Sequence, residues 1–193
     1  MGRPSKARAH GRLGATGSQA SAGKGLKVVF TREQIRARVR KLAEELNRDY
    51  RGKTLHVVGI LEDCFMFMPD LVRALTMPVV CHFLKVQIHD SSAGTVPVRE
   101  VLFTPRVEAS GRDLLLLEGV VESGVTLDHL YRHILAQNPR SLRIAALIEK
   151  TDRRKVDVPT DYVCFTTSEK YLVGYGLGYK DRFRNLPCIV RTA

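Results

Sequence analysis

Residues 114–127 carry the side chains whose types and spacing point most directly to chemistry. Ser123, Gly124 and Thr126 stand at the expected start of a helix, where backbone N–H groups point outward and the helix dipole is positive. A helix start of this kind binds a phosphate group. Glu118 and Glu122 frame the same loop, where carboxylates suit a sugar or a metal ion. The loop is therefore predicted to bind a phosphorylated sugar, with the alternative that it only turns a strand into a helix.

The elements around this loop must position it. Four consecutive leucines, 114–117, predict a strand buried on both faces, as in a parallel sheet. Leu127, Leu130 and Ile134 then share one face of a helix expected over about 126–136. Thr31 and Gln34 form a capping box that starts an earlier helix. With a further helix at 65–75, strands are expected at 55–61, 79–87, 100–107, 142–148 and 162–166. This alternation predicts an open α/β sheet with ligand loops at the carboxyl ends of its strands.

The run of leucines followed by Glu-Gly-Val-Val-Glu-Ser-Gly resembles the phosphoribosyl-diphosphate (PRPP) motif of the type I phosphoribosyltransferases. Three further segments, at 58–73, 138–143 and 161–187, are similar to the hypoxanthine-guanine phosphoribosyltransferases of purine salvage. The resemblance covers about residues 31–190. It implies an α/β type I phosphoribosyltransferase fold: an open, mainly parallel sheet flanked by helices, with a small hood over the purine. It also implies a homo-oligomer, either a dimer or a tetramer.

The resemblance assigns a role to each site residue. Glu122 becomes the candidate catalytic residue, placed near purine N7. Tyr171 fits the aromatic residue that stacks on the purine, and the backbone of Val163 fits the group that contacts the purine edge. The family often has a purine-contacting lysine at the position of Pro159. The remaining assignments are phosphate and ribose binding for Glu118, Ser123, Gly124, Val125 and Thr126, and the pyrophosphate side for Glu62, Asp63, Cys64 and Arg184.

The pyrophosphate side departs from the family pattern. Glu62 and Asp63 replace a lysine and a glycine. Two unit charges 4 Å apart interact by about 4 kcal/mol at an effective dielectric of about 20, so this exchange is expected to lower PRPP affinity by a factor of about 100 or more. Acids expected to support Mg²⁺ are replaced by Gly119 and Gly178, so a Mg²⁺ site is possible but weakened, and no metal ligand is assigned. The alternative is that Glu62 and Asp63 form a solvated loop without a ligand role.

Composition adds the remaining expectations. The net charge is +11, and residues 1–30 hold six Lys or Arg and no acid. Residues 1–27 are predicted to be a disordered basic tail and 28–193 the phosphoribosyltransferase-like domain. The tail is either a solubilising extension or an arm that contacts RNA or another polyanion. No apolar run approaches the roughly 20 residues of a membrane span, and no secretory signal is present, so a cytoplasmic protein without membrane contact is expected.

Three functions follow from these patterns. The first is a protein that binds a purine nucleotide and has impaired or lost PRPP-dependent catalysis. The second is an active hypoxanthine/guanine phosphoribosyltransferase that makes IMP or GMP with Mg²⁺. The third is a nucleic-acid-associated regulator that uses the basic tail.

Overall fold

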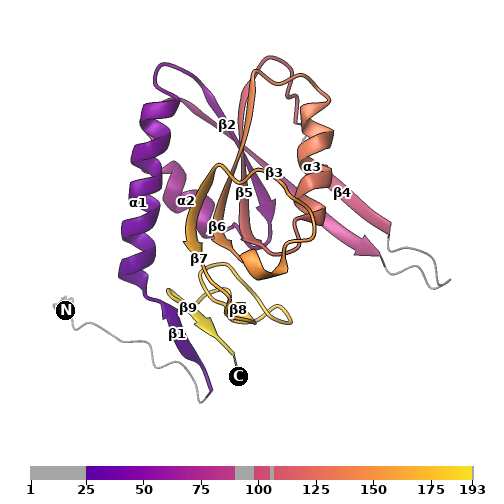
Figure 1. Cartoon of the computed structure of the whole chain (residues 1–193). Coiled ribbons are helices and arrows are strands. Elements are labelled where there is room, and N and C mark those ends of the chain that lie inside the picture. The colour runs from indigo at the N-terminus through magenta and orange to yellow at the C-terminus, as the bar shows by residue number, and fades with distance from the viewer. Residues whose placement is uncertain (1–24, 90–97, 105–106, 193) are drawn as a thin grey trace, which may run out of the picture.

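The central feature of the fold is a six-stranded sheet with the strand order β4-β3-β2-β5-β6-β7 (Figure 1). The computed structural model describes residues 25–89, 98–104 and 107–192. Five strands are parallel, and only β4 runs antiparallel to its neighbour β3. The mainly parallel sheet predicted from the sequence is therefore confirmed. The strands are β2 Leu55–Leu61, β3 Val79–His89, β4 Val98–Thr104, β5 Asp113–Val121, β6 Ser141–Glu149 and β7 Tyr162–Thr166.

Helices cover both faces of this sheet. The helices α1 (Arg32–Asp49) and α2 (Phe67–Val72) pack on one face, and α3 (Val125–Leu135) packs on the other (Figure 1). Leu115 and Leu117 of β5 belong to the apolar cluster with α1, whereas Leu114 and Leu116 belong to the cluster with α3. All four leucines are 0% exposed. The leucine strand is therefore buried on both faces, as its sequence predicts.

The helix ends follow from local hydrogen bonds. At the start of α1, the Thr31 hydroxyl oxygen accepts from the Gln34 amide at 3.3 Å, and the Gln34 side chain accepts from the Thr31 amide at 2.8 Å. The predicted capping box is confirmed. The helix α2 is shorter than the expected 65–75, because the Ala74 and Leu75 amides bond three residues back and so leave the α-helical pattern.

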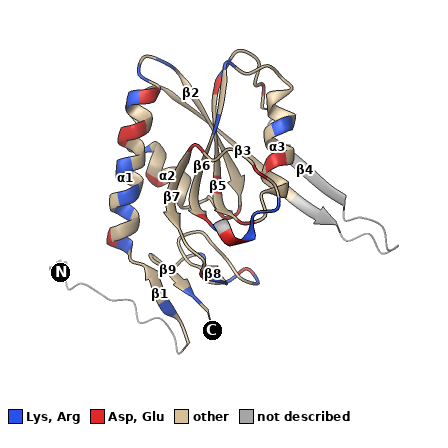
Figure 2. Cartoon of the chain, in the orientation of Figure 1, with Lys and Arg blue, Asp and Glu red and all other residues tan. Residues whose placement is uncertain are grey.

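Charge is spread along the outer surface of α1. Basic and acidic residues both occur along this helix, with several basic residues in succession in its middle (Figure 2), and most of its charged residues are exposed. This mixed face is consistent with a solvated surface. Within the part of the chain that the structure describes, no helix has both the length and the apolar character needed to cross a membrane.

A small antiparallel sheet forms a second unit beside the carboxyl ends of the main strands. Its strands are β1 Lys27–Phe30, β9 Ile189–Arg191 and β8 Leu172–Val173, in that order. It corresponds to the hood implied by the resemblance. Lys27 already pairs with Arg191, so the expected tail boundary at residue 27 falls inside β1. Residues 1–24 of the predicted tail lie outside the described residues.

Candidate functional site

A cavity of about 420 Å³ lies between the carboxyl ends of β5 and β6 and the segment that includes β8. Four of the predicted phosphate-side residues line its wall, namely Glu118 of β5, Ser123 and Gly124 of the loop that follows, and Thr126 of α3, whereas Val125 is not among the lining residues. The candidate catalytic residue Glu122 lines the same wall. Tyr171, predicted to stack on a purine, lies on the wall contributed by the hood. The structure therefore brings together two sets of residues that are about 45 positions apart in the sequence.

The loop before α3 has a fixed backbone. Gly124, at the N-cap, has a positive φ of 79°, and a Cβ added there would lie 2.8 Å from the carbonyl oxygen of Val156. Only glycine tolerates both conditions. The carbonyl oxygen of Ser123 accepts from the amides of Lys155 and Val156 at 3.0 and 3.1 Å. These bonds hold the start of α3 against the cavity, where its dipole favours an anion.

The base-binding end is defined by Tyr171. This residue is 62% exposed, and its carbonyl oxygen accepts from the amide of Thr192 at 3.1 Å. Its neighbours Leu172 and Val173 also line the cavity. Val163 does not line it; the Val163 carbonyl oxygen accepts instead from the Arg38 side chain. Of the two predicted purine contacts, the structure places only Tyr171 at the cavity.

Two cations in the cavity wall are not among the site residues predicted from the sequence. Lys150 is 3% exposed, and its ammonium group forms an ion pair with Glu122. A guanidinium nitrogen of Arg153 lies 3.9 Å from the other carboxylate oxygen of Glu122. Pro159 is not among the lining residues, so the cation on this side comes from the end of β6. Lys150 directly follows β6, and the rule that ligands bind beyond strand carboxyl ends could have indicated it.

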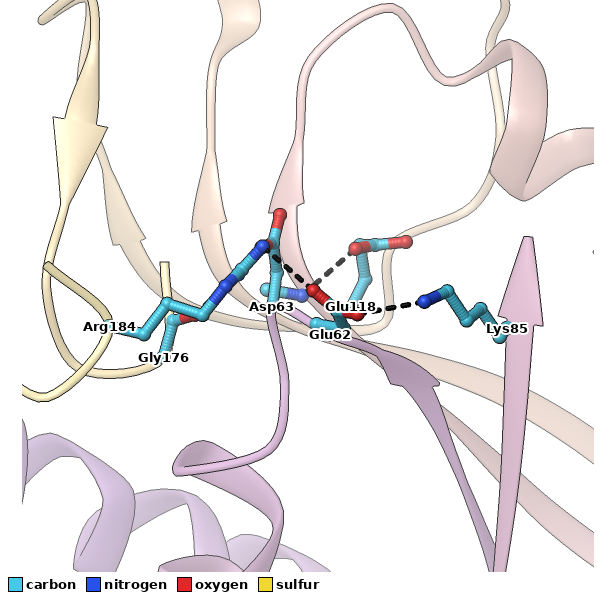
Figure 3. A network of polar contacts seen from close by, with 7 residues as sticks. Glu62, Asp63, Lys85, Glu118, Gly176 and Arg184 are labelled. Atoms are coloured by element: carbon cyan, nitrogen blue, oxygen red, sulfur yellow. Dashed lines mark hydrogen bonds and ion pairs between the residues drawn. The ribbon is translucent and has the colours of Figure 1, made fainter. Parts of the chain in front are cut away.

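The pyrophosphate-side residues form a network of ion pairs (Figure 3). One guanidinium nitrogen of Arg184 contacts the Asp63 carboxylate and donates to the carbonyl oxygen of Gly176 at 2.7 Å. The other lies 3.2 Å from Glu62, whose second oxygen accepts from Lys85 at 2.8 Å. The Lys85 hydrogen bond and charge, aided by Arg184, lower the pKa of Glu62. Glu62 and Asp63 are therefore paired with internal cations.

The structure changes what is expected of two predicted site residues, Glu118 and Cys64. Burial, reinforced by the charge of Asp63, raises the pKa of Glu118 from 4.5 to about 8, so its carboxyl group is mostly neutral at pH 7. Cys64, expected on the pyrophosphate side, is 0% exposed and belongs to the core cluster that contains α1 and α2. Burial raises the pKa of its thiol to about 12, which leaves it unreactive.

Gly119 and Gly178 lie against the same network. A Cβ added at Gly119 would lie 2.6 Å from Cβ and 2.8 Å from the carbonyl oxygen of Asp63. A Cβ added at Gly178 would lie 2.7 Å from the guanidinium carbon of Arg184. The two glycines thus leave the space that the Asp63–Arg184 pair occupies. Among the described residues, no three His, Cys, Asp or Glu side chains are grouped so that they could hold a metal ion.

Comparison with known proteins explains this arrangement of loop, hood and cavity. Residues 29–180 match the model of the phosphoribosyl transferase domain. The chain belongs to the phosphoribosyl transferase family. Curated relatives place it in the hypoxanthine-guanine phosphoribosyltransferase type. The enzyme of that name from Dictyostelium discoideum is 35% identical over 165 residues, covering 83% of this chain and 92% of the relative. The enzyme of the same name from Mycobacterium bovis is 38% identical over 168 residues, which cover 84% of this chain and 83% of the relative.

Solved structures of phosphoribosyltransferases have a fold similar to that of this chain. A hypoxanthine phosphoribosyltransferase from Trypanosoma cruzi complexed with the product IMP gives a TM-score of 0.81 at 31% identity, covering 90% of this chain and 93% of that one. A hypoxanthine phosphoribosyltransferase from Staphylococcus aureus gives a TM-score of 0.80 at 30% identity, covering 86% of this chain and 91% of that one. The family and the fold inferred from the resemblance are confirmed.

Proposed function

We propose that this phosphoribosyltransferase binds a purine nucleoside monophosphate and that its PRPP-dependent turnover is weakened or lost. The observation that carries the proposal is the contrast between the two ends of the site. The loop of Ser123, Gly124 and Thr126 opens onto the cavity at the start of α3. Arg184, the cation on the diphosphate side, is already engaged by Asp63 and Glu62.

The monophosphate end supports nucleotide binding. The cavity wall combines the start of α3, the cations Lys150 and Arg153, and the Tyr171 ring. A helix start and nearby cations suit a phosphate, and a stacked aromatic ring contributes about 1–3 kcal/mol per base. The related enzyme from Trypanosoma cruzi is described as complexed with the product IMP, which supports a purine nucleotide as the ligand class here.

The diphosphate end supports weak PRPP binding. A diphosphate that used Arg184 would have to displace the Asp63 carboxylate. A hydrogen bond to a charged group contributes about 1.5–3 kcal/mol, so losing this contact costs about 10- to 150-fold in affinity.

The residues present also do not fit the Mg²⁺ that enzymes of this type generally use. Gly119 and Gly178 offer no side-chain oxygen, Glu118 is mostly neutral at pH 7, and Asp63 is paired with Arg184. The donor set is therefore poor for a hard divalent cation, which prefers charged oxygen ligands.

The second candidate is an active hypoxanthine/guanine phosphoribosyltransferase. The identity of 35–38% to curated enzymes over more than four fifths of the chain favours it, because similarity of this extent commonly accompanies a shared activity. In that case Glu122, held by Lys150, would accept a hydrogen bond or a proton from purine N7.

Calorimetric titration with IMP, GMP, AMP and PRPP, with and without Mg²⁺, separates the candidates. We expect a purine monophosphate to bind at least tenfold more tightly than PRPP. A steady-state assay with PRPP, Mg²⁺ and hypoxanthine or guanine completes the test, with the Dictyostelium discoideum enzyme as the reference. Turnover within tenfold of that reference would overturn the proposal in favour of the second candidate.

The assembly and location of the protein form part of the same proposal. We expect a cytoplasmic homo-oligomer, either a dimer or a tetramer. The related Trypanosoma cruzi enzyme is described as having a C-terminal region with a role in its oligomeric state and enzymatic activity, which supports a link between assembly and activity in this type of enzyme. Light scattering coupled to size exclusion would measure the mass of the oligomer, and a monomer at all concentrations would contradict it.

A further inference from the structure

We propose that Asp63 is a specificity-determining residue: its carboxylate acts as an internal anion that competes with a diphosphate ligand for Arg184. This inference rests on the proposed function and deepens it, because it names the side chain that makes one end of the site selective. The contact joins a loop after β2 to the segment that follows the hood strand β8 (Figure 3).

The donors of Arg184 are committed within the protein. One terminal nitrogen serves both Asp63 and the Gly176 carbonyl oxygen, and the other faces Glu62 at 3.2 Å. A hollow of about 340 Å³ adjoins this guanidinium and is lined in part by Glu62, Asp63, Lys85 and Asp181. An incoming diphosphate would meet two cations, Lys85 and Arg184, that are already paired with Glu62 and Asp63. Binding there requires exchange of a protein carboxylate for a ligand oxygen.

Asp63 holds Arg184 more firmly than Glu62 does. Glu62 divides its two oxygens between Lys85, at 2.8 Å, and Arg184, at 3.2 Å. The ion pair of Asp63 is made with Arg184 and is the shorter of the two contacts to that guanidinium. Neutralising Asp63 therefore removes the closest anion from the guanidinium, whereas neutralising Glu62 would also disturb Lys85.

The two glycines show that this pair is built into the local packing. The backbone and Cβ of Asp63 lie within 3 Å of a Cβ added at Gly119, and the Arg184 side chain lies equally close to a Cβ added at Gly178. Packing therefore couples residues 63, 119, 178 and 184 in this structure. An acid introduced at 119 or 178 without a change at 63 or 184 would collide with the pair.

The test measures the affinity of inorganic pyrophosphate by isothermal titration calorimetry. Asp63→Asn should bind pyrophosphate about tenfold or more tightly than the wild type, because a charge-assisted contact to Arg184 becomes available. Asp63→Ser is a second neutral variant in case the first folds poorly. Glu108→Gln is the matched control, since it removes one negative charge from a remote, exposed ion pair with Arg112.

The double variant Asp63→Asn/Arg184→Gln decides whether the gain passes through Arg184. We expect the gain to disappear in this variant. Unchanged pyrophosphate affinity in both neutral Asp63 variants, an equal gain in Glu108→Gln, or a gain that survives the loss of Arg184 would each overturn the proposal. IMP affinity, measured on the same proteins, tests the proposed function separately: wild-type protein that fails to bind IMP refutes nucleotide binding, while the pyrophosphate comparison still decides the role of Asp63.

Discussion

Replacement of Glu118 by glutamine should stabilise the protein increasingly as the pH rises from 5 to 8. Burial and the nearby Asp63 charge raise the pKa of Glu118 from 4.5 to about 8. The folded protein therefore keeps a proton that the unfolded chain releases above about pH 4.5. The stabilising contribution of the protonated carboxyl group is complete below pH 4.5 and is lost as the pH rises through 8. Glutamine has a similar shape and cannot ionise, so Glu118→Gln escapes this loss.

The size of the effect follows from the pKa difference. Each tenfold change in proton affinity corresponds to about 1.4 kcal/mol, so the rise from 4.5 to about 8 sets an upper bound of about 5 kcal/mol. Glu118 also lines the cavity and so has some access to water. We expect a gain in the free energy of unfolding of about 2 kcal/mol for Glu118→Gln at pH 8 relative to pH 5.

Urea denaturation of the wild type and Glu118→Gln at pH 5, 6, 7 and 8 would measure this difference. Glu62→Gln is a control of opposite sign, because pairing with Lys85 lowers the pKa of Glu62. The stability that ionised Glu62 contributes is present above about pH 4.5 and is lost as the pH falls through its lowered pKa. Glu62→Gln should therefore lower the free energy of unfolding by a constant amount from pH 5 to 8. Parallel stability curves for the wild type and Glu118→Gln from pH 5 to 8 would refute the buried, protonated carboxyl group.

Three further predictions concern the base end, the glycine contacts and the tail. Tyr171→Ala should weaken GMP binding about tenfold with an unchanged melting temperature, since the ring is exposed, while Tyr171→Phe should bind normally in the same titration. Gly119→Ala should lower the free energy of unfolding by about 1–3 kcal/mol, and Gly178→Ala by less, because the latter meets a side chain that can move; equal losses in urea denaturation would contradict this reasoning. If the tail binds RNA, deleting residues 1–24 should make affinity less dependent on salt concentration; an unchanged, shallow dependence in filter binding would exclude that role.

Much of the main sheet could be predicted because its determinants are local. The four leucines of β5 and the capping box at Thr31 act over a few residues, and the structure contains both features. The start of α3 was also predictable, because the turn from strand to helix needs a backbone conformation that a small residue such as glycine adopts readily. Gly124, with its positive φ, is the clearest example.

The hood strands could not be predicted from periodicity. The strand β8 has two residues and β9 has three, which are too few to show an alternating pattern. The pairing of β1 with β9 joins segments about 160 residues apart. The resemblance to a known family supplied the hood, whereas residue patterns alone did not.

The electrostatics of the site were only partly predictable. Sequence reasoning treated Glu62 and Asp63 as anions free to repel a diphosphate. In the structure Lys85 pairs with Glu62, and Arg184 pairs with Asp63. Arg184 lies more than 120 positions after Asp63 in the sequence. The expected weakening of PRPP binding therefore shifts in cause, from repulsion by the acids to occupation of the arginine. Long-range ion pairs of this kind leave no local pattern in a sequence.

The order of strands in the hood has a consequence for synthesis of the protein. The middle strand, β9, is made of residues 189–191, while its outer neighbour β1 begins at residue 27. During translation the strand made first therefore waits for its partner until nearly all of the described chain has left the ribosome. The strands that carry the phosphate loop, β5 and β6, precede β9 by about 40 residues or more. A nascent protein can therefore form this loop before the hood covers the cavity.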